Sequence, residues 1–301
     1  MASLACEAVI RGRRLTTSGL QPPLLVNKAV HLKFHFLAAP AGLLLLLCFA
    51  LPVGVLFGVA FFEPDFTTQH FVRFFESAGY LSVFRNTLIV SASVTVACVL
   101  LGYPFAAFIV FKSRKTQYIW LFLVLVPMWM SILIRSYAWM VVLGRQGIIN
   151  DALLALGFTS EPVKMLFTTG AVYLAMIQIL LPFMIVTCYS AMTSVDLTLL
   201  RAARVLGSSP TKAFFSVFVP LTLAGAFNGA AVVFILALGF YATPALLGGR
   251  HDAMIANTIA NQIAQADWAF ASAIAVVLLV TSVLILLIFR MASKPFLYSR
   301  D

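Results

Sequence analysis

Several residue types that commonly do chemistry occur in this sequence without the spacing that the chemistry requires. His31 and His35 are four residues apart and could share a metal ion, but the glutamate of the HExxH pattern is missing. The sequence has no GxSxG nucleophile pattern and no GxxxxGK(S/T) phosphate loop. None of its cysteines forms a CxxC pair. We therefore expect no catalytic residue, no metal site and no cofactor bound by this chain.

A second group of candidates consists of polar residues within long apolar runs. Arg135 lies near one end of such a run, where its side chain either extends to a membrane surface or lines the entrance of a passage. Gln178 is a similar candidate for a passage. For Asn228 and Tyr241, in a run interrupted by glycines, a pathway role and a structural role are equally compatible with the sequence.

The composition of the chain requires a membrane around these residues. Of the 301 residues, 62% are hydrophobic and 10% are charged, and the mean hydropathy is +1.03. A soluble core cannot cover so much apolar surface, so lipid must act as the solvent. The net charge of +10 comes from basic residues dispersed between apolar runs, which argues against a nucleic-acid-binding face.

Six apolar stretches are long enough to cross a bilayer, because about 20 residues of helix span roughly 30 Å of hydrocarbon. The sequence therefore predicts an all-α integral membrane protein with about six transmembrane helices, at 37–62, 86–111, 118–143, 168–190, 221–247 and 268–289. The first stretch has no evident small-x-small cleavage site after it, which favours a retained helix over a cleaved signal.

The positions of the positive charges predict the orientation. If the loops alternate between the two sides, 14 of the 20 Lys and Arg residues share the side of both termini, five lie on the other side, and Arg135 lies within a stretch. Loops rich in Lys and Arg stay in the cytoplasm. We therefore expect both termini to be cytoplasmic.

The loop between the fourth and fifth stretches has the turn chemistry of two short helices. Asp196 is a suitable N-cap for a helix over 197–206, and Gly207 supplies the left-handed residue that ends it. Ser209 would cap a second helix with Pro210 at its first position, and Pro220 would open the next membrane stretch. By its shape alone, this pair could lie on the membrane surface or insert into a groove of a partner.

The same loop resembles the EAA loop of binding-protein-dependent ABC importer permeases. The residues that match the family pattern include Ala202, Ala203, Gly207, Phe215 and Pro220. The resemblance implies that the loop carries the coupling helix, which docks on the ATPase subunit. Arg201 departs from the family pattern, which usually has Glu at this position, so the complementary charge on the partner is left open.

The resemblance extends over 81–291. The blocks at 132–158 and 238–249 look like the spermidine/putrescine branch of these permeases. The resemblance implies the type I ABC importer permease fold. The domain organisation is then a cytoplasmic tail at 1–36, a first transmembrane helix at 37–62, and the type-1 transmembrane domain at 81–291. The coupling loop lies within that domain at 196–220, and a second cytoplasmic tail follows at 292–301.

The function implied is that of a permease subunit in the bacterial inner membrane, which forms the pathway for a small solute by ATP-driven alternating access. Its implied partners are a second, homologous permease, two cytoplasmic ATPases that bind ATP and Mg, and an extracytoplasmic solute-binding protein. The alternative is a self-sufficient secondary transporter or channel, which would normally need titratable groups in its helices. No Asp or Glu lies deep in any of the six stretches.

The substrate is the least determined part of this interpretation. A polyamine such as spermidine or putrescine is cationic and should meet carboxylates or aromatic faces, and the stretches offer only aromatic residues. Three alternatives remain open: the partner permease supplies the acid, the binding protein makes the selection, or the substrate is a related solute such as an opine or another amine.

Overall fold

The computed structural model describes residues 24–62, 65–249 and 251–297, with the backbone alone for 24–39, 41 and 294–297. The side chains of His31 and His35 therefore lie outside the described part of the chain, as do residues 1–23 of the predicted tail. The described chain forms two units that meet inside α2 (Leu24–Phe62), one ending at Val55 and one beginning at Leu56. The first unit is represented by its α2 residues alone.

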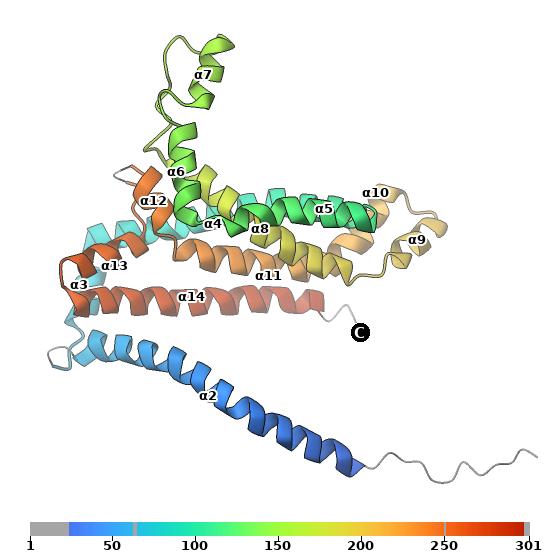
Figure 1. Cartoon of the computed structure of the whole chain (residues 1–301), viewed down its shortest axis with the longest axis horizontal. Helices are drawn as coiled ribbons and strands as arrows, with labels where there is room; N and C mark the ends of the chain where they lie inside the picture. Colours follow the sequence, from blue (N-terminus) through green and yellow to red (C-terminus); the bar gives the residue numbers. More distant parts are fainter. Residues whose placement is uncertain (1–23, 63–64, 250, 298–301) are drawn as a thin grey trace, which may run out of the picture. The chain divides into compact units, whose positions relative to one another are not determined.

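The second unit is helical throughout its described residues, with turns between the helices. Four of its helices form the centre: α8 (Thr169–Thr193) packs against α4 (Ala78–Val110) and α11 (Val219–Leu238), and α14 (Trp268–Leu297) packs on α11 (Figure 1). The shorter elements are α3 (Gln69–Glu76), α5 (Arg114–Leu125), the 3-10 turn η1 (Val126–Trp129), α6 (Ile132–Val142), α7 (Ile148–Ala155), α9 (Thr198–Val205), α10 (Pro210–Ala213), the π-helical turn η2 (Phe214–Phe218), α12 (Ala242–Leu247) and α13 (Ile255–Ala264).

Within the described residues, five helical runs are long and apolar enough to cross a membrane: 42–62, 78–110, 169–193, 210–238 and 268–293. A sixth is obtained if the bent pair Arg114–Trp129 and Ile132–Val142 counts as one span. The expectation of an all-α membrane protein with about six spans is confirmed by the lengths and composition of these helices.

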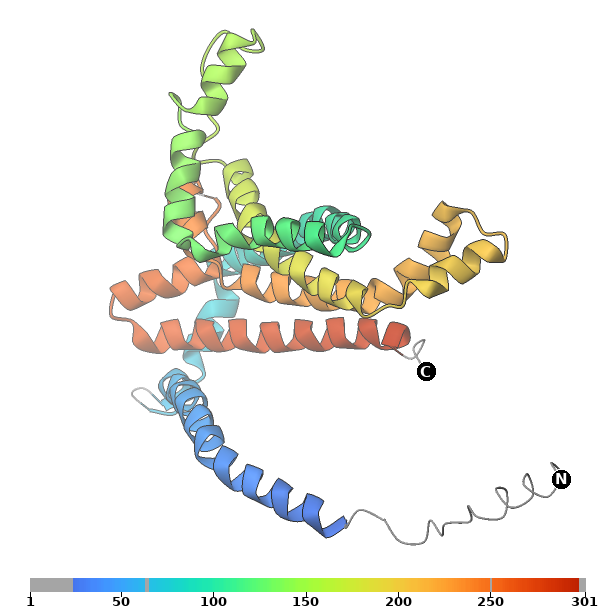
Figure 2. The ribbon, with the colours of Figure 1, turned by 45° about the vertical axis from the view of Figure 1, so that its right-hand side comes forward.

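The stretch predicted as one helix over 118–143 is broken into two helices in the structure. The two arms of this stretch meet at 94°, and α6 leaves the direction of α5 (Figure 2). Pro127 has no N–H to donate to the preceding turn, so α5 passes into the 3-10 turn η1. Met130 then adopts an extended backbone, which ends the helix before α6 begins. A hydropathy window detects the apolar run but not this change of direction.

The predicted bounds of the stretch 221–247 are also wrong at both ends. Its helix begins at Pro210 and continues through η2 to Leu238. Pro220 does not open the span, because the wider π turn before it lets Val219 N–H bond to the carbonyl of Phe214 and leaves room for the proline ring. The helix ends at Gly239, and α12 is a separate short helix.

The close approach of α8 and α11 depends on two glycines of α11. A Cβ atom on Gly225 would overlap the Cβ of Ala191, and one on Gly229 would lie 2.8 Å from the sulfur of Met184. Both glycines are buried in the contact. The small residues at these positions therefore serve helix packing, as the Gly225 and Gly229 spacing indicates.

Candidate functional site

The loop around α9 has the local geometry that its turn residues predict. The Thr198 backbone N–H donates to Asp196 Oδ1 over 2.8 Å, although α9 itself begins at Thr198, one residue later than expected. That hydrogen bond holds the pKa of the Asp196 carboxyl below its usual range, with a smaller contribution from the charge of Arg201. Gly207 ends the helix at a φ of +89°. Ser209 accepts from the Lys212 N–H over 3.3 Å and Pro210 follows it.

The side chains of this loop divide into a packed group and an exposed group. Leu200 and Phe218 are buried, and the Phe214 ring stacks on Phe218. Val205 and Leu206 are 88% and 86% exposed. Leu200 and Leu206 therefore do not share one packed face, because Leu206 lies after the last turn of α9 and is exposed.

The residues of the EAA-like stretch, the departing Arg201 included, range from exposed to half-buried. Arg201 and Ala202 are exposed on α9, and Ala203 is half-buried. Phe215 is 70% exposed, and Pro220 is half-buried at the start of α11. The loop thus presents apolar and basic side chains outward while its base is packed on the helices.

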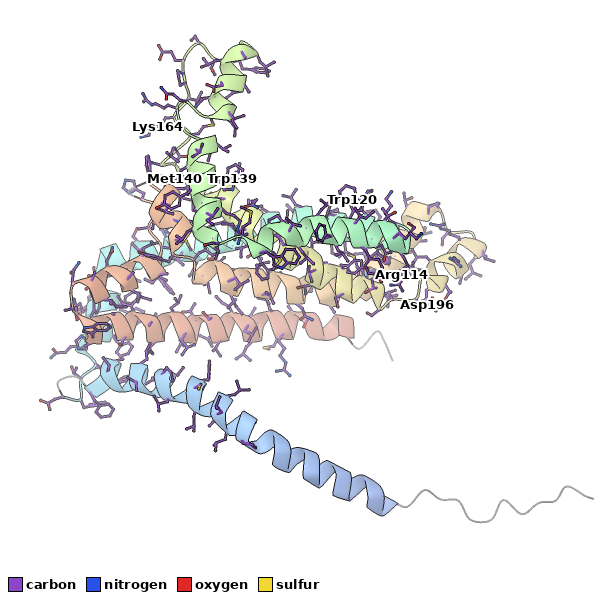
Figure 3. The ribbon with its side chains drawn as sticks, in the orientation of Figure 1. Arg114, Trp120, Trp139, Met140, Lys164 and Asp196 are labelled. Atoms are coloured by element: carbon purple, nitrogen blue, oxygen red, sulfur yellow. The ribbon has the colours of Figure 1, made fainter. Side chains whose placement is uncertain are left out.

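Gln178 lines a cavity with a volume of about 850 Å³. The cavity lies between α4, α5, α6 and α8, and three aromatic side chains, Phe105, Trp139 and Tyr173, line it among mostly aliphatic residues. The Trp139 indole N–H donates to Gln178 Oε1 over 3.4 Å. The volume is within the range of small-molecule sites. Trp139 reaches the cavity from α6 (Figure 3).

The other polar candidates lie elsewhere. Asn228 is exposed on α11 and Tyr241 is half-exposed just before α12, and neither lines this cavity. The Tyr241 carbonyl accepts from the Asn257 amide over 3.1 Å, which joins α13 to the break after α11. The structure therefore brings Gln178 together with aromatic residues, but it does not bring the four pathway candidates together.

Arg135 is buried within the chain, with 8% of its surface exposed. Its Nε and Nη1 atoms are enclosed and have no hydrogen-bond acceptor among the described residues. Burying a charged group without partners costs several kcal/mol, roughly speaking. The next residue, Ser136, is also buried, and its hydroxyl pairs with that of Thr243 in α12.

Two polar contacts at the end of the helices away from α9 could not be predicted from the sequence. Arg73 of α3 forms an ion pair of 2.8 Å with Asp267 and lies 4.0 Å above the Phe270 ring. The hydrogen bond to Asp267 raises the pKa of the Arg73 guanidinium. Asp252, which is buried, accepts from the Thr169 hydroxyl over 2.6 Å and from the Gly249 N–H over 2.8 Å.

Residues 98–294 match the family model of the binding-protein-dependent transport system inner membrane component. The chain belongs to this family. The permease is 35% identical over 262 residues to the spermidine/putrescine transport system permease protein PotB of Escherichia coli (strain K12), which covers 84% of this chain and 94% of PotB. It is 36% identical over 238 residues to PotB of Haemophilus influenzae, which covers 79% of this chain and 83% of that protein.

Solved structures share the fold of this permease. A chain in the crystal structure of a bacterial ABC transporter involved in the import of the acidic polysaccharide alginate matches with a TM-score of 0.71 at 20% identity. The match covers 89% of this permease and 99% of that chain. A chain in the crystal structure of a bacterial alginate ABC transporter in complex with an alginate pentasaccharide-bound periplasmic protein matches with a TM-score of 0.73 at 19% identity. The expected ABC importer permease fold is confirmed, and the permease is a transport subunit rather than an enzyme.

Proposed function

We propose that this permease forms the membrane pathway for a polyamine, spermidine or putrescine, or for a closely related amine. The single observation that carries the proposal is its similarity to PotB of Escherichia coli, which extends over 84% of this chain at 35% identity. Trp139 and Tyr173 in the cavity at Gln178 support a cationic substrate, because an ammonium group is attracted to the faces of Trp and Tyr rings.

We infer that the permease works with a second, homologous permease, with two cytoplasmic ATPases that bind ATP and Mg, and with an external solute-binding protein. The likeness to a transporter that was crystallised with its periplasmic protein supports this assembly. The excess of Lys and Arg at the α9 end supports a cytoplasmic position for that end and for both termini.

The loop at α9 would dock on one ATPase, with Val205, Leu206 and Phe215 as its exposed apolar contacts. The site would comprise Arg201, Ala202, Ala203, Gly207, Phe215 and Pro220. Docking can move the membrane helices because the helical run from Pro210 to Leu238 is continuous, so a displacement at α10 is carried into α11. α11 in turn packs on α4, α8 and α14.

ATP would drive transport by selecting between two arrangements of these helices. If the closed ATPase dimer fits the outward-facing arrangement better, ATP binding shifts the population toward it, and hydrolysis returns the inward-facing arrangement. Gln178 and Trp139 are the pathway residues best placed to meet the solute, while Arg135, Asn228 and Tyr241 belong to the surroundings of the pathway. An acid for the second ammonium group would come from the partner permease.

The substrate is tested by ATP hydrolysis in the complete transporter, reconstituted with its binding protein. We expect spermidine or putrescine to stimulate hydrolysis several-fold, because the coupling free energy between two sites is typically about 1–3 kcal/mol. Butane-1,4-diol, which has the length of putrescine without its charges, should give no stimulation. Stimulation by an opine alone would contradict the polyamine assignment, and uptake that continues without the ATPases would favour a secondary transporter.

A further inference from the structure

Four basic side chains surround one cavity between α9 and the connection from α4 to α5. Lys112 and Arg114 come from the connection and the start of α5, and Arg201 and Arg204 come from α9. The cavity has a volume of about 380 Å³. Figure 3 shows Arg114 and Asp196 at the end of the helices where α9 lies. This cationic cavity has no role in the proposed passage of the solute.

Buried contacts hold the two sides of the cationic cavity in place. Gln117 is 7% exposed, and its amide donates to the carbonyls of Val110 and Lys112 over 2.9 and 3.0 Å. The oxygen of the same amide accepts from the Tyr189 hydroxyl of α8 over 2.9 Å. On the other side, Leu200 is buried and fixes the face of α9 that carries the two arginines. The cations are therefore presented by a fixed framework.

The positive charge of the cavity is not neutralised within the described chain. No acidic side chain lines it, and none of the four cations forms an ion pair with a described residue. Asp196 acts on Arg201 through its charge, but it is exposed, lies outside the lining and is held by Thr198. Lys112 lies 4.3 Å above the Phe108 ring. Four like charges around one cavity repel each other, and an anion between them would relieve that repulsion.

The arrangement of donors suits a phosphate group. Guanidinium groups bind phosphate oxygens through paired N–H donors, and a lysine adds a point charge. α5 begins at the cavity, and its Ser113 hydroxyl pairs with Thr116 rather than with a backbone N–H. No side chain therefore caps the first N–H groups of this 12-residue helix, and helix N-termini of this kind favour anions.

The surface beside the cavity favours a lipid phosphate over a free one. The neighbouring turns of α4 and α5 expose a run of large apolar side chains: Phe108, Phe111, Tyr118, Ile119 and Phe122. An acyl chain can lie along such a surface while its headgroup enters the cavity. Val205 and Leu206, the exposed residues suited to an ATPase, lie outside the cavity lining. Arg201 belongs to both proposed sites, and the other docking residues lie outside the cavity lining.

We propose that the cationic cavity binds the phosphate of an anionic phospholipid, such as phosphatidylglycerol, and that this lipid joins α9 to the α4–α5 connection. Arg201 has a particular place in this site. A glutamate there, as in the EAA pattern, would put a negative charge in the lining and repel the phosphate. The arginine in place of the usual glutamate at position 201 would then add a contact with the lipid phosphate.

Native mass spectrometry of the full chain tests the proposal. The chain is extracted from vesicles of equal parts phosphatidylcholine and phosphatidylglycerol, and the retained phosphatidylglycerol is counted. Arg201→Glu is expected to weaken retention about thirtyfold, since each basic charge contributes about a factor of five and the reversal adds an opposing charge. Arg204→Gln should weaken it about fivefold. Arg145→Glu is the matched control, because Arg145 is exposed on the α6–α7 connection.

Equal retention by Arg201→Glu and Arg145→Glu would overturn the proposal. A separate arm compares the Tm of the chain in neutral detergent with added phosphatidylglycerol or with inorganic phosphate. We expect a rise with the lipid alone, and an equal rise with inorganic phosphate would overturn the assignment to a lipid. Unchanged lipid retention together with loss of the ATPase on purification would instead assign the cations to a carboxylate of that partner. None of these readouts depends on which solute is transported.

Discussion

Gly207→Val is expected to reduce transport and substrate-stimulated ATP hydrolysis by roughly tenfold while the permease still inserts into the membrane. Gly207 ends α9 at a φ of +89° with open space around its Cα, so the added side chain meets no neighbour. The cost is in the backbone, because a β-branched residue in the left-handed region is strained by about 1–2 kcal/mol or more. The end of α9 would shift, and with it Val205 and Leu206, the proposed contacts with the ATPase.

The chain supplies a matched control for this variant. Gly157 follows α7 and has a φ of +72°, again with open space around it. Gly157→Val should therefore carry the same backbone strain at a site far along the chain from α9. We expect it to insert normally and to keep coupled ATP hydrolysis. Coupling lost equally in both variants, or retained in Gly207→Val, would contradict the docking role of the α9 loop.

Gly225→Val is expected to prevent the permease from reaching its folded state in useful yield. A Cβ at this position overlaps the Cβ of Ala191, whose backbone cannot move without displacing α8. Overpacking of a core typically costs about 1–3 kcal/mol, and a branched side chain in a contact between two helices belongs at or above the upper end. The measurement is the Tm and the yield of monodisperse protein after extraction.

A pair of milder variants separates helix packing from a role in the pathway. Gly225→Ala alone should lower Tm, and Ala191→Gly in the same chain should restore much of the loss, because it removes the atom that the new Cβ meets. Gly79→Ala, whose Cβ would lie 3.7 Å from the Ser77 hydroxyl, should leave Tm unchanged or raised. Additive losses in the double variant would show that the α8–α11 contact is not the cause.

The parts of the fold that depend on neighbouring residues could be predicted from the sequence. The apolar runs locate the membrane helices because lipid imposes a minimum length on each of them. Gly207 defines the end of α9, and Ser209 and Pro210 define the start of α10, because caps and left-handed glycines act within one turn, whereas the N-cap of α9 is Leu197 and not the expected Asp196. The one-residue shift at the start of α9 is within the usual variation of helix ends.

Changes of direction within an apolar run could not be predicted in this way. Pro127 and Pro220 are both prolines within apolar runs, yet one precedes a bend of 94° and the other lies in a continuous helix. The difference lies in the backbone around them: an extended residue follows η1, whereas a π turn precedes Pro220. Hydropathy carries no information about either backbone conformation.

Contacts between distant segments were also beyond the sequence pattern. Arg73 and Asp267 are 194 residues apart and meet because α3 packs on α14. Lys112 and Arg201 line one cavity because Gln117 and Leu200 fix their elements against the core. Arg135 stands out in the sequence as a charge within an apolar run, but the run does not reveal that its Nε and Nη1 atoms have no acceptor among the described residues.

The central claim, that the α9 loop docks on an ATPase, is tested most directly by cross-linking from Val205, which is 88% exposed. A Val205→Cys permease in a background without its other cysteines is treated with a short bifunctional reagent in inner-membrane vesicles that contain the whole transporter. We predict an adduct with the ATPase subunit whose yield changes on addition of ATP, and none from Leu156→Cys, which is 71% exposed beyond α7. An ATPase adduct from Leu156→Cys, with none from Val205→Cys, would contradict the account.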